Sequence, residues 1–217
     1  MKQIFDLNSP IMRFLSWLTD MLLLSLLTIV CSIPLITLSP SIIAASRVVQ
    51  DMIHEEDGKI IKTFFTHFAK NLKQGMLCSF ITCIGIVIYA FDIFWLISKQ
   101  STTSVILVTV LVIVSILFIA FLIRLHVLMA RYENSLQQHF FNAFVFTCWH
   151  FARSIFVSAI ASIPCISLIF FPDFFFLFLP VWILFFPGIS LYLFNRILKP
   201  SFQQIEDISK KNCDNMI

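Results

Sequence analysis

A run of about twenty residues without a single charge, from about residue 104 to 123, constrains this chain more than any other feature. The run consists mainly of Val, Ile, Leu and Phe and ends at Arg124. A helix needs about 20 apolar residues to cross the hydrocarbon core of a bilayer. The run therefore predicts a membrane-spanning helix.

Four further runs of similar character cover residues of about 14–36, 76–97, 154–171 and 174–194. Only 12% of the 217 residues are charged and the mean hydropathy is +0.93, whereas a soluble domain carries about 25% charged residues. We therefore expect an all-α, polytopic transmembrane helix bundle with about five spanning helices, forming one membrane domain over residues 1–217. Because only Pro172 and Asp173 separate the last two runs, we expect a tight antiparallel hairpin there.

Lys and Arg are distributed unequally between the segments that join these runs. On one side the basic residues are sparse: Lys2, Arg13 and Lys99. On the other side they are dense: Arg47, Lys59, Lys62, Lys70, Lys73, Arg124, Arg131, Arg153, Arg196, Lys199, Lys210 and Lys211. Cytoplasmic segments are enriched in Lys and Arg, so the pattern predicts an external amino terminus and a cytoplasmic carboxyl terminus in a plasma membrane.

Two of the basic segments, about 40–73 and 131–153, predict amphipathic helices on the cytoplasmic side. Ser39-Pro40 has the pattern of an N-cap followed by a helix start, and Glu55-Glu56-Asp57-Gly58 predicts a break. These helices could simply lie at the headgroup surface beside the bundle. Alternatively they form a docking surface for a cytoplasmic partner, whose candidate residues are Lys59, Lys62, Lys70, Lys73 and Arg131.

Two carboxylates interrupt the apolar runs, Asp20 in the first and Asp92 in the second. Placing a charge at the centre of a bilayer costs about 2.5–3.5 kcal/mol on the insertion scale, so both are candidates for a polar intramembrane site. In the predicted orientation both lie toward the external side. The alternative is that each carboxylate reaches the interface or pairs with Arg13 or Lys99.

Motifs of known catalytic or cofactor chemistry are missing from the sequence. The four glycines cannot supply a phosphate-binding loop, and no Cys pair has C-x-x-C spacing. The net charge of +3 is too small to indicate nucleic acid. We therefore expect no metal, no cofactor, no nucleic-acid partner and no enzymatic activity. Small residues repeat every fourth position, at Ser154, Ser158 and Ser162, which favours close helix packing.

The first run and the segment after it resemble the YesL family of small bacterial membrane proteins, a domain of unknown function. The similarity is carried by Leu22-Leu23-Leu24, Cys31-Ser32-Ile33-Pro34, Thr37-Leu38-Ser39-Pro40, Ala44-Ala45, Phe64-Phe65, Phe68, Asn71 and Lys73-Gln74, with a weaker echo at Ala130-Arg131-Tyr132-Glu133, Asn142-Ala143 and His150. The family usually has Gly at the position of Ser39. The resemblance implies a multi-pass protein of the bacterial cell membrane, often associated with carbohydrate importers of the ABC type.

Two functions follow as hypotheses. The first is a non-catalytic accessory membrane protein of an ABC-type solute uptake system, with a carbohydrate as the solute and the importer permease as partner. The second is a small autonomous transporter or channel that uses Asp20 and Asp92. Either could form a homo-oligomer in the lipid bilayer.

Overall fold

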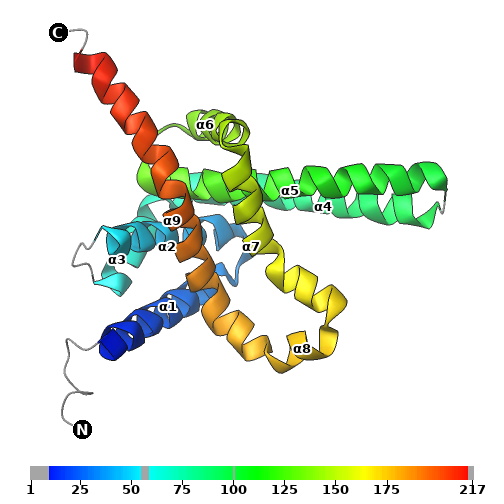
Figure 1. Ribbon diagram of the computed structural model, residues 1–217, viewed down its shortest axis with the longest axis horizontal. Coiled ribbons are helices and arrows are strands. Elements are labelled where there is room, and N and C mark those ends of the chain that lie inside the picture. The colour runs from blue at the N-terminus through cyan, green and yellow to red at the C-terminus, as the bar shows by residue number, and fades with distance from the viewer. Residues whose placement is uncertain (1–9, 55–58, 100, 215–217) are drawn as a thin grey trace.

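The computed structural model describes residues 10–54, 59–99 and 101–214, and within these ranges it contains helices and no strand (Figure 1). The break predicted at Glu55–Gly58 lies outside the described residues. The helices are α1 (Pro10–Ser32), the 3₁₀ turn η1 (Leu35–Thr37), α2 (Leu38–Ile53), α3 (Ile60–Lys70), α4 (Leu72–Ser98), α5 (Thr102–Arg131), α6 (Leu136–Trp149), α7 (Phe151–Phe170), α8 (Pro172–Leu177) and α9 (Leu179–Asp214).

Five of these helices are long and apolar enough to cross a membrane, namely α1, α4, α5, α7 and α9. The predicted all-α class and the five candidate spans are thereby confirmed. The connection between the last two spans differs from the expected two-residue turn, because the six-residue helix α8 lies between them. Pro172 explains the difference: the residue before a proline is disfavoured in helical conformation, so α7 ends and a new helix starts with proline in its first turn.

Helix α2 is the centre of the fold. Ten of its sixteen residues are buried, and it packs against α1, α3, α4, α5 and α9. A helix floating at the headgroup surface would leave one face open, so that interpretation is wrong for α2. The helix also starts two residues earlier than predicted: it follows directly on η1 with Thr37 as N-cap, and Ser39 is a buried residue of its first turn.

Because α2 returns along α1, the first and last helices run in opposite directions. The Trp17 and Tyr192 rings are 5.4 Å apart, and further along α1 the Gly188 amide donates a hydrogen bond of 2.8 Å to Ser25 Oγ. Residue numbers therefore rise along α1 as they fall along α9. The start of α1 and the end of α9 consequently lie on the same side of the bundle (Figure 1). The predicted orientation, with an external amino terminus and a cytoplasmic carboxyl terminus, would require these two helices to be parallel.

Two glycines permit backbones to approach closely at the centre. A Cβ placed on Gly188 would lie 2.5 Å from the Met21 carbonyl oxygen of α1, and one on Gly75 would lie 2.6 Å from Pro40 Cγ of α2. Neither contact is sterically possible for a larger residue without moving a helix. Glycine at these positions thus sets the distances of α9 to α1 and of α4 to α2, as small residues do in membrane bundles.

The outer parts of α4 and α5 form an antiparallel hairpin that projects from the other helices (Figure 1). Its surface consists of large apolar side chains. More than 60% of the residue surface is exposed at Val87, Phe91, Phe94, Val105 and Ile106. In water such a surface would be unstable, so it belongs in lipid or against another membrane protein.

Two shorter helices cover the side where the chain ends lie. α3 packs against α2 through Phe64, which is completely buried. α6 starts at a capping box formed by Ser135 and Gln138 and packs against α5. An exposed ion pair between Lys70 at the end of α3 and Glu133 links these two peripheral parts.

Candidate functional site in the buried polar network around α2

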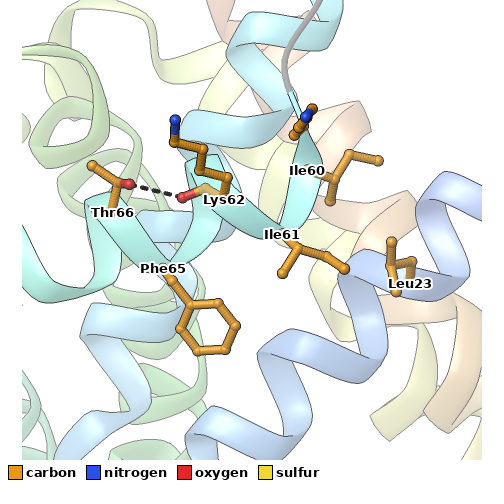
Figure 2. A pocket seen from close by; sticks show the side chains of 7 residues that line it. Leu23, Ile60, Ile61, Lys62, Phe65 and Thr66 are labelled. Carbon is orange, nitrogen blue, oxygen red and sulfur yellow. Dashed lines mark hydrogen bonds between the residues drawn. The ribbon is translucent and has the colours of Figure 1, made fainter.

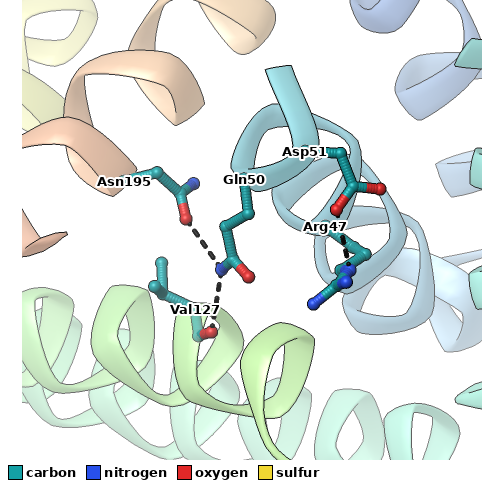
Figure 3. Close-up of polar contacts among 5 residues, drawn as sticks. All are labelled: Arg47, Gln50, Asp51, Val127 and Asn195. Carbon is teal, nitrogen blue, oxygen red and sulfur yellow. Dashed lines mark hydrogen bonds and ion pairs between the residues drawn. The ribbon is translucent and has the colours of Figure 1, made fainter. Parts of the chain in front are cut away.

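Gln50 connects α2 to two other helices. Its Nε2 donates hydrogen bonds to the Val127 carbonyl oxygen at 3.2 Å and to Asn195 Oδ1 at 3.0 Å (Figure 3). Asn195 in turn donates through Nδ2 to the Leu191 carbonyl within α9. Gln50 and Asn195 are both buried, and a buried amide without partners would be costly. The three helices α2, α5 and α9 are therefore held in one mutual arrangement.

A second connection joins α2, α4 and α5 through His126. Its Nδ1 lies 2.6 Å from the Leu122 carbonyl oxygen and its Nε2 lies 3.0 Å from Ser39 Oγ. Since a carbonyl can only accept, Nδ1 carries a proton, and the neutral ring accepts the Ser39 hydroxyl at Nε2. The Ser39 amide donates to Ser79 Oγ at 2.9 Å. Ser39 next to the His126 imidazole resembles the pairing of a nucleophile with its general base. However, the side chains of Ser39, Ser79 and His126 are all buried.

Arg124 provides the third connection. Its residue surface is only 1% exposed; Nε donates to Ser154 Oγ and Nη2 to the His150 carbonyl oxygen, both at 3.2 Å. Nη1 is buried and has no hydrogen-bond partner within the described part of the chain. Next to it, Arg153 Nη1 donates to Ser201 Oγ at 2.6 Å. The two arginines thus connect α5 to α7 and α7 to α9 without a carboxylate.

Two basic side chains, Arg131 and Lys199, lie close to the carboxyl ends of α2 and α5. They line a small hollow together with Gln50, His54 and Asn195. The carboxyl ends of helices carry partial negative charge, so cations at this place stabilise them. Arg131 also lies over the Phe202 ring, at 5.5 Å from its centroid. The hollow is too small to hold a substrate and is best described as part of the packing.

The structure does not bring Asp20 and Asp92 together. Asp20 is half-buried near the middle of α1. Asp92 is exposed on α4 in the projecting hairpin (Figure 1). Neither carboxylate forms an ion pair with another described residue, whether Arg13, Lys99 or any other. Instead, Lys99 lies over the Trp95 ring at 4.0 Å. A shared acidic site of Asp20 and Asp92 is not formed.

The five residues predicted as a docking surface lie in different surroundings. Lys59 and Lys62 line a groove between α1 and α3, and Lys73 is exposed at the start of α4. Lys70 pairs with Glu133, and Arg131 is half-buried against aromatic rings. Only Lys59, Lys62 and Lys73 therefore present amino groups that lack a carboxylate partner among the described residues.

Outside the spanning helices, three groups have shifted pKa values. A hydrogen bond from Lys70 lowers the pKa of the exposed Glu133. Burial lowers the pKa of His139 in α6. Burial and, secondarily, the Arg47 guanidinium lower the pKa of His67 in α3. In both cases the folded state disfavours the protonated imidazole.

Sequence reasoning did not identify the residues of this polar network. One signal was present: at 100° per residue Ser39, Ser46 and Gln50 lie on one face of α2. A polar stripe on an otherwise apolar helix indicates polar partners on its neighbours. Arg124 was used only to mark the end of the third apolar run and as one of the basic residues of the cytoplasmic side, not as a buried side chain. No group of three or more His, Cys, Asp or Glu side chains suited to a metal ion occurs in the described ranges.

The fold and the network define a class: a multi-pass membrane-helix protein stabilised by buried polar contacts around a central short helix. Residues 19–93 match the family described as "Protein of unknown function, DUF624", the domain family of YesL-like proteins. Residues 19–93 are thus similar to this domain family, and the resemblance to YesL-like proteins is confirmed over that part of the chain. The matched segment runs from within α1 through α2 and α3 into α4. No curated protein and no solved structure matches the chain.

Proposed function

We propose that this protein is a non-catalytic accessory subunit of an ABC-type solute importer, with a carbohydrate as the transported solute. The observation that carries the proposal is the projecting α4–α5 hairpin, whose exposed apolar side chains offer a long surface to a second membrane protein (Figure 1). The resemblance to YesL-like proteins, which are often associated with such importers, supplies the class of partner.

An autonomous transporter is supported less well. That function requires a polar path through the bundle, but its two candidate carboxylates lie on helices without an extensive mutual contact: Asp20 near the middle of α1 and Asp92 near the outer end of α4. The buried side chains of Gln50, Arg124 and His126 instead form hydrogen bonds across helices. Bonds of this kind hold helices in place, which suits a rigid scaffold better than a moving gate.

The orientation that fits this proposal places both chain ends in the cytoplasm. In this orientation Lys99, between α4 and α5, is the one basic residue in the segments that connect helices on the external side. Arg47 is not counted for either side because it lies within α2. All other Lys and Arg lie toward the side of the chain ends or in the segments that lead there. This distribution agrees with the positive-inside rule more closely than the orientation inferred from five spans alone.

Fusion reporters test the orientation. A fluorescent protein that folds only in the cytoplasm should be bright when fused to either chain end. Alkaline phosphatase, which is active only outside, should be active when inserted at Ser101 and inactive at either chain end. Phosphatase activity at the amino terminus together with fluorescence at the carboxyl terminus would contradict this orientation. That result would support an external amino terminus and a cytoplasmic carboxyl terminus.

Affinity purification in a mild detergent, followed by mass spectrometry, tests the accessory role. We expect an importer permease or its solute-binding protein to copurify in stoichiometric amount. The double variant F91A/F94A on the hairpin should lose that partner, whereas the control F156A, which removes an equally exposed ring from α7, should retain it. Recovery of this chain alone, together with substrate flux in liposomes that D92N abolishes, would replace the accessory role with autonomous transport.

A further inference from the structure

An open groove of about 810 Å³ lies between α1 and α3 (Figure 2). Its lining combines apolar and basic side chains from the two helices. The residues are Leu23 of α1 together with Lys59, Ile60, Ile61, Lys62, Phe65 and Thr66 at and after the start of α3.

The apolar part of the lining is not covered by the protein itself. Phe64 anchors α3 in the core, yet the neighbouring Ile61 and Phe65 are 51% and 48% exposed. Both side chains point to the same side of α3 as the α1 wall, where Leu23 faces them (Figure 2). Leu23 belongs to a helix that can cross the membrane. A hydrocarbon chain from the bilayer therefore has direct access to this surface.

The charged side chains in the described part of the lining are cationic. Lys59 and Lys62 supply two amino groups, and no carboxylate of a described residue lines the groove. The Thr66 hydroxyl already donates to the Lys62 carbonyl oxygen at 2.8 Å and so offers no free proton (Figure 2). Lysine ammonium groups bind phosphate as point charges. The groove thus presents positive charge beside a hydrocarbon surface, the complement of an anionic amphiphile.

We propose that this groove binds one anionic phospholipid, with its phosphate at Lys59 and Lys62 and an acyl chain along Ile61, Phe65 and Leu23. A protein partner would have to supply both a negative group and an extended apolar segment at the level of a spanning helix. An anionic phospholipid supplies both in one molecule. The inference does not depend on the proposed importer role.

Lipid titration monitored by native mass spectrometry tests the proposal. The purified full-length chain in a neutral detergent is titrated with phosphatidylglycerol and, separately, with phosphatidylcholine. We expect one phosphatidylglycerol to bind about 30-fold more tightly than phosphatidylcholine, the factor that corresponds to two lysines near an anionic surface. The preference should weaken as salt is added.

Matched variants assign the effect to the groove. K59Q/K62Q should remove the preference for phosphatidylglycerol, and K73Q, which neutralises an exposed lysine outside the groove, should keep it. F65A should weaken both lipids, whereas F141A, which removes an exposed ring from α6, should weaken neither. Circular dichroism of each variant checks the fold. Equal binding of the two lipids by the original protein, or equal losses in K59Q/K62Q and K73Q, would overturn the proposal.

Discussion

The close approach of α9 to α1 yields the sharpest prediction, made with the substitution Gly188→Ala. The added Cβ would lie 2.5 Å from the Met21 carbonyl oxygen, whereas ordinary contacts begin near 3.4 Å. The helices must separate, and the hydrogen bond from the Gly188 amide to Ser25 Oγ is lost or lengthened. Introducing atoms into a packed core costs about 1–3 kcal/mol.

Two smaller effects also contribute to the change in the free energy of unfolding. Loss of an interhelical hydrogen bond in a membrane protein costs about 0.6 kcal/mol, and alanine is favoured over glycine inside a helix by about 1 kcal/mol. The free energy of unfolding should therefore fall by roughly 0.5–2.5 kcal/mol. For a chain of this length the middle of that range corresponds to a decrease in Tm of about 3–6 °C.

Thermal unfolding of the purified protein in detergent, read by size-exclusion chromatography after heating, measures this change. Gly85→Ala is the matched control, because a Cβ at Gly85 would meet only Phe118 Cζ at an ordinary 3.8 Å. The control should be as stable as the original protein or slightly more so. Equal Tm values for the two variants would refute the close contact of α1 and α9, and with it the antiparallel arrangement that the contact defines.

Three further predictions concern α2 and α6. Gly75→Ala should lower Tm because its Cβ would collide with the Pro40 ring. An unchanged Tm would contradict the close approach of α4 to α2 at Gly75. In a double-mutant cycle of Gln50→Leu and Asn195→Leu, thermal unfolding should give a coupling of about 0.5–1.5 kcal/mol, and strictly additive losses would deny their hydrogen bond. Because burial lowers the pKa of His139 from its ordinary 6.5, the folded state binds fewer protons than the unfolded state, so stability should fall as pH drops below about 6.5. The variant H139Q should show a weaker pH dependence of Tm between pH 7.5 and 5, and an identical dependence would assign the effect to other groups.

The helices that face lipid could be predicted from the sequence, whereas the position of α2, which does not face lipid, could not. Apolar runs predicted α1, α4, α5 and α7 because lipid requires about 20 apolar residues wherever a helix crosses. α2 has sixteen residues and includes Gln50. Other helices surround it, so its hydropathy carries no information on its depth. Because α2 returns along α1, α1 and α9 run antiparallel, whereas the count of five apolar runs had made the first and last helices parallel.

The prediction of a site formed by Asp20 and Asp92 also required the directions of the helices, which the sequence did not supply. Charge within an apolar run correctly singled out Asp20 and Asp92 as unusual, but their relative positions depend on helix direction, which the runs do not encode. The repeat of Ser154 and Ser158 did predict close packing. In the structure Ser154 accepts from Arg124, and Ser158 donates to the Ile116 carbonyl oxygen at 2.7 Å.

The hydrogen bond between Gln50 and Asn195 has a consequence for how the protein is made. The two residues are 145 positions apart, and at about 5–20 residues per second the ribosome needs roughly 7–30 s to progress from one to the other. During this interval α2 has emerged and α5 can supply the Val127 carbonyl oxygen, but Gln50 still lacks Asn195, the side-chain partner that it has in the finished bundle. The nascent chain must keep α2 hydrated or held by another protein until α9 is synthesised, so the last helix to be made completes the centre of the fold.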